Sequence, residues 1–361
     1  MSRFEIFDID SFAYFCYNYL MRDNIKSYSL NAMMDRMMNL DVEQYRAEQI
    51  FKWIWQKNAK DFSVMTNLSQ EFRRELSQKF IIAGVNAETL LMAKDGSRKY
   101  SLKTEDAETI EVVFIPEGKR KTVCVSTQIG CPLGCQFCAT GLMGLKRNLK
   151  AYEIADEIRI IQEDTDEKVT NIVFMGMGEP LLNLKEVMEA IEIIRSPMGL
   201  SVSQRHTTIS TVGLIPGLEK LLVSSLKVKL AISLNFADQE MRKEMMPAAR
   251  KNPLRQIIRL AREYSLKKNM VTFEYVLMDK VNDRIADARQ LLRLLKGVPS
   301  KINLIPYNPH PLLPFKRPSD KKIQCFYNYL LASPHTITLR KSKGQEILAA
   351  CGQLAVIERK K

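Results

Sequence analysis

The chain has 361 residues, of which 46% are hydrophobic and 26% charged, as in an ordinary folded protein. Its 54 lysines and arginines exceed its 41 acidic residues and give a net charge of +13. That surplus favours a polyanionic partner, although many folded proteins are simply basic. Seven cysteines are too few for a disulfide scaffold, and the N-terminus lacks the basic and apolar pattern of a signal peptide. We expect no membrane segment and a cytoplasmic location.

The first third of the chain divides into three regions. Residues 1–41, an N-terminal extension rich in aromatic residues and methionine, receive no predicted role. Residues 42–82 carry apolar residues at helical spacing, with Ser69 as a possible cap, and predict a small helical accessory domain. Residues 83–121 contain short alternating or apolar runs, which predict a β-rich extension.

From residue 122 onward the chain repeats a strand, a polar loop and an amphipathic helix. This alternation predicts an α/β fold with a partial parallel (βα)6 barrel. Sites in such folds lie at the carboxyl ends of the strands, so the polar loops are expected to share one site. The six expected strands are 122–126, 171–175, 207–210, 228–233, 271–277 and 301–306.

Three cysteines follow the first of these strands with the spacing C-x3-C-x2-C, at Cys131, Cys135 and Cys138. Three thiolates from one turn suit a 4Fe–4S cluster, which is normally held by four. The next cysteine is Cys325, so one iron of such a cluster would be open to another ligand. The alternatives are a zinc site completed by a residue such as His206, or cysteines that simply pack. Zinc sites usually pair two C-x2-C knuckles, and no second one exists here.

Polar residues also follow the other strands. Gly176-Met-Gly178-Glu179-Pro180 would let the backbone approach a ligand, and Glu179 could accept a hydrogen bond from an ammonium group. An ordinary tight turn is the alternative, because short glycine-rich loops are weak signals. Ser210, Ser233 and Asn308 each end a strand, where they could contact a ligand or cap a helix.

Two further cysteines stand apart from the loop. Cys124 precedes it by seven residues, and Cys351 lies near the C-terminus between small neighbours. Each is either a reactive thiol or an inert buried side chain.

Four motifs together resemble the RlmN/Cfr family of radical-SAM RNA adenine methyltransferases. The resemblance covers residues 42–355 and implies a radical-SAM partial barrel over residues 122–361 that ends in a catalytic cysteine segment. The motifs are the cysteine loop up to Gly141, Gly176-Met-Gly-Glu-Pro-Leu-Leu-Asn183, Asn303-Leu-Ile-Pro-Tyr-Asn308-Pro, and Ala349-Ala-Cys-Gly-Gln-Leu354.

This resemblance implies two cofactors, a 4Fe–4S cluster and S-adenosylmethionine (SAM). Cys131, Cys135 and Cys138 would hold the cluster, and its open iron would chelate the amino and carboxylate groups of SAM. The residues expected to contact SAM are Gly178, Glu179, Ser210, Ser233, Asn235 and Asn308.

The resemblance also implies a mechanism with two SAM molecules. The first methylates Cys351, and the second yields a 5′-deoxyadenosyl radical that takes hydrogen from the new methyl group. The resulting methylene radical adds to an adenine ring carbon. Cys124 helps to remove the ring proton and then forms a disulfide with Cys351, while Glu111 assists proton movement. Turnover needs an external electron donor and a thiol reductant.

The family contains a C2-directed and a C8-directed branch. Pro180 and the following Leu-Leu-Asn183 resemble the C2 branch, which implies a monomeric enzyme acting on 23S rRNA and tRNA. Two positions depart from the family pattern: Asn235 replaces a usual histidine, and Ala248-Ala249 replace Ile-Asn. The alternatives are the C8-directed activity, a non-catalytic Fe–S or zinc protein that binds RNA, and a radical-SAM enzyme acting on a small molecule.

Overall fold

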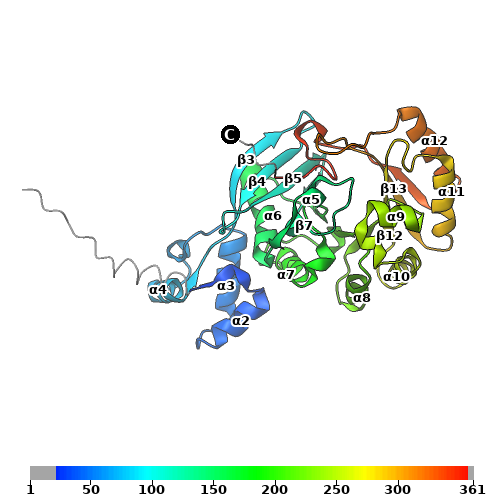
Figure 1. The fold of residues 1–361 in the computed structure, drawn as a ribbon. Coiled ribbons are helices and arrows are strands. Elements are labelled where there is room, and N and C mark those ends of the chain that lie inside the picture. Colours follow the sequence, from blue (N-terminus) through cyan, green and yellow to red (C-terminus); the bar gives the residue numbers. More distant parts are fainter. Residues whose placement is uncertain (1–21, 357–361) are drawn as a thin grey trace, which may run out of the picture. The chain divides into compact units, whose positions relative to one another are not determined.

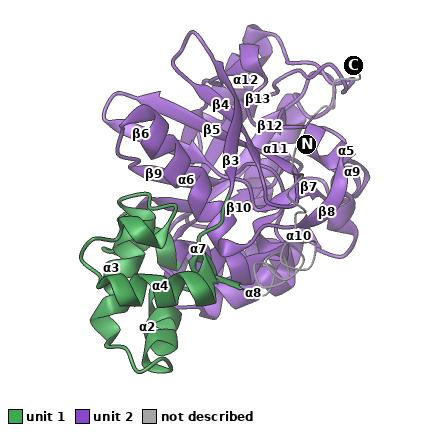
Figure 2. Cartoon of the chain, turned by 90° about the vertical axis from the view of Figure 1, so that its left-hand side faces the viewer, with its two compact units in different colours: residues 1–84, 192–201 green, residues 85–191, 202–361 purple. Residues whose placement is uncertain are grey.

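The structure is a computed structural model that describes residues 22–356. Two compact units make up the chain, coloured green and purple in Figure 2. The smaller unit contains the described residues up to Gly84 together with Glu192–Ser201. The larger unit contains Val85–Ile191 and the chain from Val202 onward. Residues 1–21 of the expected N-terminal extension lie outside the described part.

The smaller unit is helical, as the sequence predicts for residues 42–82. Ser69 caps its last helix by accepting a hydrogen bond from the Phe72 amide at 3.2 Å, which satisfies one of the free N–H groups of the first turn. The unit is larger than expected, because α2 lies before residue 42 and packs through the buried Met33 and Met37. Its main elements are α2 (Leu30–Met38), α3 (Gln44–Trp55), α4 (Gln70–Lys79), β1 (Asp23–Asn24) and β2 (Phe80–Ile81).

The larger unit is built on one ten-stranded sheet (Figure 1). Seven consecutive neighbours, from β6 to β14, pair in parallel, and β3–β5 continue the same sheet in antiparallel order. The predicted fold is thus confirmed, with one parallel strand more than expected. The strands are β3 (Asn86–Met92), β4 (Arg98–Lys103), β5 (Thr109–Glu117), β6 (Arg120–Cys124), β9 (Asn171–Phe174), β10 (Thr207–Thr211), β11 (Lys229–Ser233), β12 (Val271–Leu277), β13 (Ser300–Pro306) and β14 (Thr336–Leu339).

Helices connect the parallel strands and bury their apolar stripes. In α6 (Ala151–Thr165), Ile154, Ile158 and Ile161 recur at helical spacing and are fully buried. The central strands are apolar over most of their length, as expected for parallel strands covered on both faces. The other connecting helices are α7 (Leu184–Arg195), α8 (Ile215–Val223), α10 (Leu254–Lys267), α11 (Ile285–Leu294) and α12 (Asp320–Leu331). Among residues 22–356, every helix is too short or too polar to cross a bilayer.

The cysteine loop is closed by a small hairpin of its own. Strand β7 (Gln128–Cys131) pairs antiparallel with β8 (Gly144–Asn148), and α5 (Ala139–Leu142) lies between them. Gly130 has φ +77°, and a Cβ there would stand 1.9 Å from the Gly144 carbonyl oxygen. Only glycine allows this approach of the two backbones. The hairpin therefore fixes both ends of the loop that carries the three cysteines.

Candidate active site at the carboxyl ends of the parallel strands

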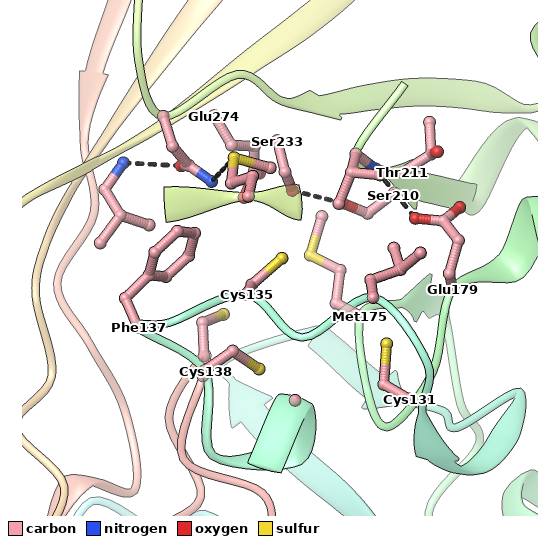
Figure 3. A pocket seen from close by; sticks show the side chains of 18 of the residues that line it. Cys131, Cys135, Phe137, Cys138, Met175, Glu179, Ser210, Thr211, Ser233 and Glu274 are labelled. Atoms are coloured by element: carbon pink, nitrogen blue, oxygen red, sulfur yellow. Dashed lines mark hydrogen bonds between the residues drawn. The ribbon is translucent and has the colours of Figure 1, made fainter. Parts of the chain in front are cut away.

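A cavity with an empty volume of about 940 Å³ lies at the carboxyl ends of the parallel strands. Figure 3 shows the cysteine loop on one side of this cavity and Ser210, Ser233 and Glu274 on the other. The lining includes nine residues that the sequence analysis selected: Cys131, Cys135, Cys138, Gly178, Glu179, Ser210, Ser233, Asn235 and Cys351.

All three loop cysteines line the cavity, as the ligands of one cluster would. A 4Fe–4S cube binds each thiolate through a different iron, so its ligands stand farther apart than those of one zinc ion. Burial raises the pKa of Cys131 to about 12, so this thiol would release its proton to solvent only when it binds a metal.

The zinc alternative completed by His206 is wrong. His206 ends the 3-10 turn Gln204–His206, which directly precedes β10. It therefore lies at the amino end of that strand, whereas the cysteines line the cavity at the carboxyl end. The imidazole instead faces Asn171, with 3.5 Å between Asn171 Nδ2 and His206 Nδ1.

Glu179 is buried and held in place by backbone donors. The amides of Val212 and Leu181 donate to its two carboxylate oxygens at 2.9 and 3.0 Å. Burial raises the pKa of Glu179, and these two hydrogen bonds oppose the rise. Each carboxylate oxygen keeps further acceptor capacity toward the cavity. The arrangement suits an ammonium group, the role that the sequence suggested.

Gly178 brings the chain into the cavity wall. It has φ +98°, and a Cβ there would lie 2.6 Å from Cβ and 2.7 Å from Cγ of Gln128. The side chain of Gln128 is itself fixed, because its Oε1 accepts a hydrogen bond from the Glu179 amide at 2.8 Å. The glycine is therefore required for two reasons, its left-handed backbone and the closeness of its neighbour.

We expect Gly178→Ala to destabilise the fold by roughly 3 kcal/mol or more, since left-handed strain and overpacking each cost about 1–3 kcal/mol. The Gly178→Ala variant is also expected to bind SAM more weakly. Gly297→Ala is a matched control, because Gly297 has φ +76° but a methyl group added to it would meet no other atom within 4 Å. Chemical denaturation and SAM titration measure both effects. If both variants lose the same amount of folding stability, the loss comes from backbone strain alone, and the close approach to Gln128 does not contribute.

Ser210, Ser233 and Asn235 meet at the ends of β10 and β11. The hydroxyl oxygens of the two serines are 3.5 Å apart. Asn235 has φ +57°, a conformation that asparagine tolerates better than most residues. Its Oδ1 accepts a hydrogen bond from the Val276 amide at 3.0 Å, so the side chain braces the next strand as well as lining the cavity. The second departure from the family pattern, Ala248-Ala249, lines neither this cavity nor the one described next.

A second and much narrower cavity adjoins the first. Met175, Ile305 and Cys351 line both, so the Cys351 side chain stands where the two meet. Cys124 lies in the wall of the second cavity, and both thiols are free. The structure therefore brings together the two cysteines that stood apart in the sequence.

The segment that carries Cys351 is held by distant parts of the larger unit. The Gly352 carbonyl accepts a hydrogen bond from the Ala139 amide at 2.8 Å, directly beside the cysteine loop. Thr140 Oγ1 donates to the Leu354 carbonyl at 2.6 Å. Asn308 Nδ2 donates to the Cys351 carbonyl at 3.3 Å. Asn308 lines the second cavity and, through this bond, positions the Cys351 segment; its expected contact with SAM stays a prediction.

Glu111 lies beneath the same segment and lines neither cavity. One carboxylate oxygen pairs with Lys99 Nζ at 2.9 Å, and the other accepts a hydrogen bond from the Ala355 amide at 2.9 Å. Burial raises the pKa of Glu111, and the Lys99 ammonium opposes the rise.

Two charged residues of the site were missed in the sequence. Glu274 lies on β12, is buried and lines the first cavity, and Arg340 follows β14 and lines the second. The two attract each other, and the Arg340 guanidinium opposes the rise that burial causes in the pKa of Cys351. A single carboxylate inside the apolar run Val271–Leu277 was a usable signal, because such strands rarely carry a charge without a function.

Comparison with known proteins identifies both units. The Radical SAM superfamily matches residues 125–293, and the ribosomal RNA large subunit methyltransferase N-terminal domain matches residues 23–82. The second match extends the resemblance to residues 23–41, which the sequence analysis had left outside it. The radical SAM superfamily uses a 4Fe–4S cluster and SAM, for which the three thiols and the Gly178–Glu179 loop provide fitting ligands.

Relatives cover nearly the whole chain. The dual-specificity RNA methyltransferase RlmN of Geobacter sulfurreducens is 44% identical over 92% of this chain and 91% of its own length. The probable RlmN of Dictyoglomus turgidum is 42% identical over 93% of this chain and 97% of its own. A crystal structure of a radical SAM methyltransferase from Sphaerobacter thermophilus superposes with a TM-score of 0.87, at 38% identity over 92% of this chain and 98% of that one. With its cysteine loop, its strand-end cavity and these relatives, the chain belongs to the RlmN family of radical-SAM RNA methyltransferases.

Proposed function

We propose that the enzyme adds a methyl group to C2 of an adenosine in 23S rRNA and in tRNA, by way of a methyl group carried on Cys351. The observation that supports this most is the place of Cys351 at the junction of two cavities. The first is lined by the cluster thiols and Glu179, and the second by Cys124. A thiol in this place faces the site expected for SAM on one side and Cys124, its proposed disulfide partner, on the other.

Each residue then has a defined task. The cluster, when bound, supplies the electron that cleaves SAM, and Glu179 with Ser210 and Ser233 would orient SAM beside it. Cys351 carries the carbon that becomes bonded to the adenine ring. As the Cys124 thiolate takes up the ring proton, the adduct radical would return one electron to the cluster. Cys124 then gives up this proton and attacks the Cys351 sulfur, so that a disulfide forms, the sulfur–carbon bond breaks and the released carbon takes up a proton. The adenine carbon is electrophilic, which is why a direct attack of the ring on the SAM methyl group is not available.

Glu111 is proposed to assist proton movement through the segment that it holds. Its contact with the Ala355 amide, four residues after Cys351, supports this role. Because turnover leaves Cys124 and Cys351 oxidised, the enzyme needs a thiol reductant in addition to an electron donor for the cluster. RNA substrates of this kind imply a cytoplasmic location.

RNA would approach the strand-end cavities across a surface that is less basic than the composition suggests. Two lysines from the basic stretches Lys119–Lys121 and Lys321–Lys322 form ion pairs: Lys121 with Glu167 at 2.6 Å, and Lys322 with Asp283 at 2.7 Å. Arg340 and Lys343, in contrast, line the second cavity itself. Phosphate contacts are therefore expected close to the two thiols.

The position of the methyl group is the decisive test of this proposal. Ribosomal RNA and tRNA from a strain that lacks the enzyme are incubated with the reconstituted protein, SAM and a reductant. Digestion to nucleosides and mass spectrometry against standards should then give 2-methyladenosine from both RNAs. Methylation only at C8 would overturn the proposed target carbon, and methylation of one RNA alone would overturn the dual substrate range.

A further inference from the structure

Arg242 is a buried cation beside the cysteine loop. It lies in α9 (Gln239–Met245), and only 1% of its surface is exposed. Its guanidinium donates hydrogen bonds to the carbonyl oxygens of Leu234 and Val212, at 3.1 and 2.5 Å. These carbonyls belong to the loops after β11 and β10 that also carry Asn235 and the amide bonded to Glu179.

No carboxylate within residues 22–356 forms an ion pair with Arg242. Two other buried cations among the described residues are paired with carboxylates: Lys99 with Glu111 at 2.9 Å, and Arg159 with Asp156 at 2.7 Å. Burying an unpaired charge costs several kcal/mol, and carbonyl dipoles compensate only part of it. Cys135, an expected cluster ligand, lies near enough that its thiolate form would attract the Arg242 guanidinium. Burial lowers the pKa of Arg242 to about 10, so the side chain is still a cation at neutral pH.

The cysteine loop is docked on the helix that carries Arg242. The backbone amide of Gln136 donates to the Met245 carbonyl at 3.0 Å, and its side-chain amide donates to the Glu244 carbonyl at 2.8 Å. These bonds use carbonyls that the end of the helix leaves free. Cys135 and Phe137 also pack in one apolar cluster with Met245 and Met246. The position of the guanidinium relative to Cys135 is therefore fixed by the fold.

A cluster held by three thiolates is an anion. An oxidised core of about +2 with three thiolates carries about −1, and one-electron reduction makes it about −2. A fixed cation nearby favours the more negative, reduced state. We propose that Arg242 is the counter-charge of the cluster and raises its reduction potential, which makes the cluster easier to reduce before SAM cleavage. This inference rests on the cluster and not on the RNA or the target carbon.

The test compares three variants of the full chain after anaerobic cluster reconstitution. Arg242→Met removes the charge at similar volume, and Arg242→Lys keeps it. Arg195→Met removes the same charge from an exposed residue paired with Glu192. Redox titration followed by electron paramagnetic resonance gives the midpoint potential. We expect Arg242→Met to shift the reduction equilibrium about tenfold toward the oxidised state, which is about 59 mV for one electron. The midpoint potential of Arg242→Lys should stay close to that of the unmodified enzyme, and that of Arg195→Met should be unchanged.

Two outcomes would overturn the proposal. An unchanged potential in Arg242→Met shows that the charge does not act on the cluster. Equal decreases in the Met and Lys variants show that the hydrogen bonds to the two carbonyls matter and the charge does not.

A second measurement covers the possibility that a variant folds poorly. Reconstitution should raise the melting temperature of the original protein more than that of Arg242→Met, because only the former has the favourable pair of charges. An equal rise in both proteins, or a failure of Arg242→Met to fold without the cluster, would assign Arg242 to the fold alone. None of these measurements includes RNA, so the result stands apart from the test of the C2 activity.

Discussion

A covalent complex between protein and RNA is expected to accumulate when Cys124 is replaced by alanine. In our proposal, Cys124→Ala still receives the methyl group on Cys351 and still forms the carbon–carbon bond to adenine. It cannot form the disulfide that releases the product, because the second thiol of the cavity is gone. The complex should appear as a nuclease-sensitive band shift in a denaturing gel. It should survive a thiol reductant, since a thioether is not reducible and a disulfide is.

Two control variants separate the roles of the thiols. Cys351→Ala should form no complex and transfer no methyl group, while it binds the cluster normally. Cys325→Ala removes an exposed thiol on α12 and should behave as the unmodified enzyme. Normal turnover of Cys124→Ala, or a complex formed by Cys351→Ala, would contradict the assigned roles even though the family is established.

Replacing Cys135 with alanine is expected to abolish the cluster. The reconstituted enzyme should contain about four irons per chain, and Cys135→Ala should retain almost none and cleave no SAM. Cys135 is buried in the loop that the β7–β8 hairpin closes. Iron analysis and the visible absorption of the cluster measure the loss, and Cys325→Ala again serves as the control.

Cys351 is the one other described cysteine in the wall of the same cavity. Its segment is tied to the chain by the bonds of Gly352 and Leu354, so we do not expect it to replace a cluster ligand. If the cluster persists in Cys135→Ala and disappears only when Cys351→Ala is added, Cys351 does replace the missing ligand. Stoichiometric zinc in place of iron would contradict the cluster itself.

The features that the sequence predicted well are local ones. The six strands are apolar runs of ordinary length, and each is followed by a helix with a regular apolar stripe, so chain order alone implies a parallel sheet. The cysteine spacing and the Gly178–Glu179 loop are equally local. Since parallel strands end at one edge of the sheet, their end residues could be expected to meet, and nine of the selected residues line one cavity.

The features that could not be predicted depend on contacts between distant segments. Strand β14 has four residues and alternates exposed with buried positions, so it has no apolar run that marks it as part of the sheet. The hydrogen bond from Asn308 Nδ2 to the Cys351 carbonyl could not be predicted either, because the segment that carries Cys351 meets this strand end only in the folded protein. The burial of Arg242 could not be predicted from the sequence, because arginine is common on the exposed faces of helices. Its burial depends on three loops that meet only in the folded protein.

The path of the C-terminal segment also affects how the enzyme is made. Its bonds to Ala139, Thr140, Asn308 and Glu111 join the end of the chain to elements synthesised much earlier. The cysteine loop and the Glu179 loop are complete when the barrel strands leave the ribosome, but Cys351 is translated after all of these strands. A growing chain that has not yet reached Cys351 therefore has the residues expected to bind the cluster and lacks the thiol that, in our proposal, delivers carbon. If that proposal holds, methyl transfer is reserved for chains that extend past Cys351.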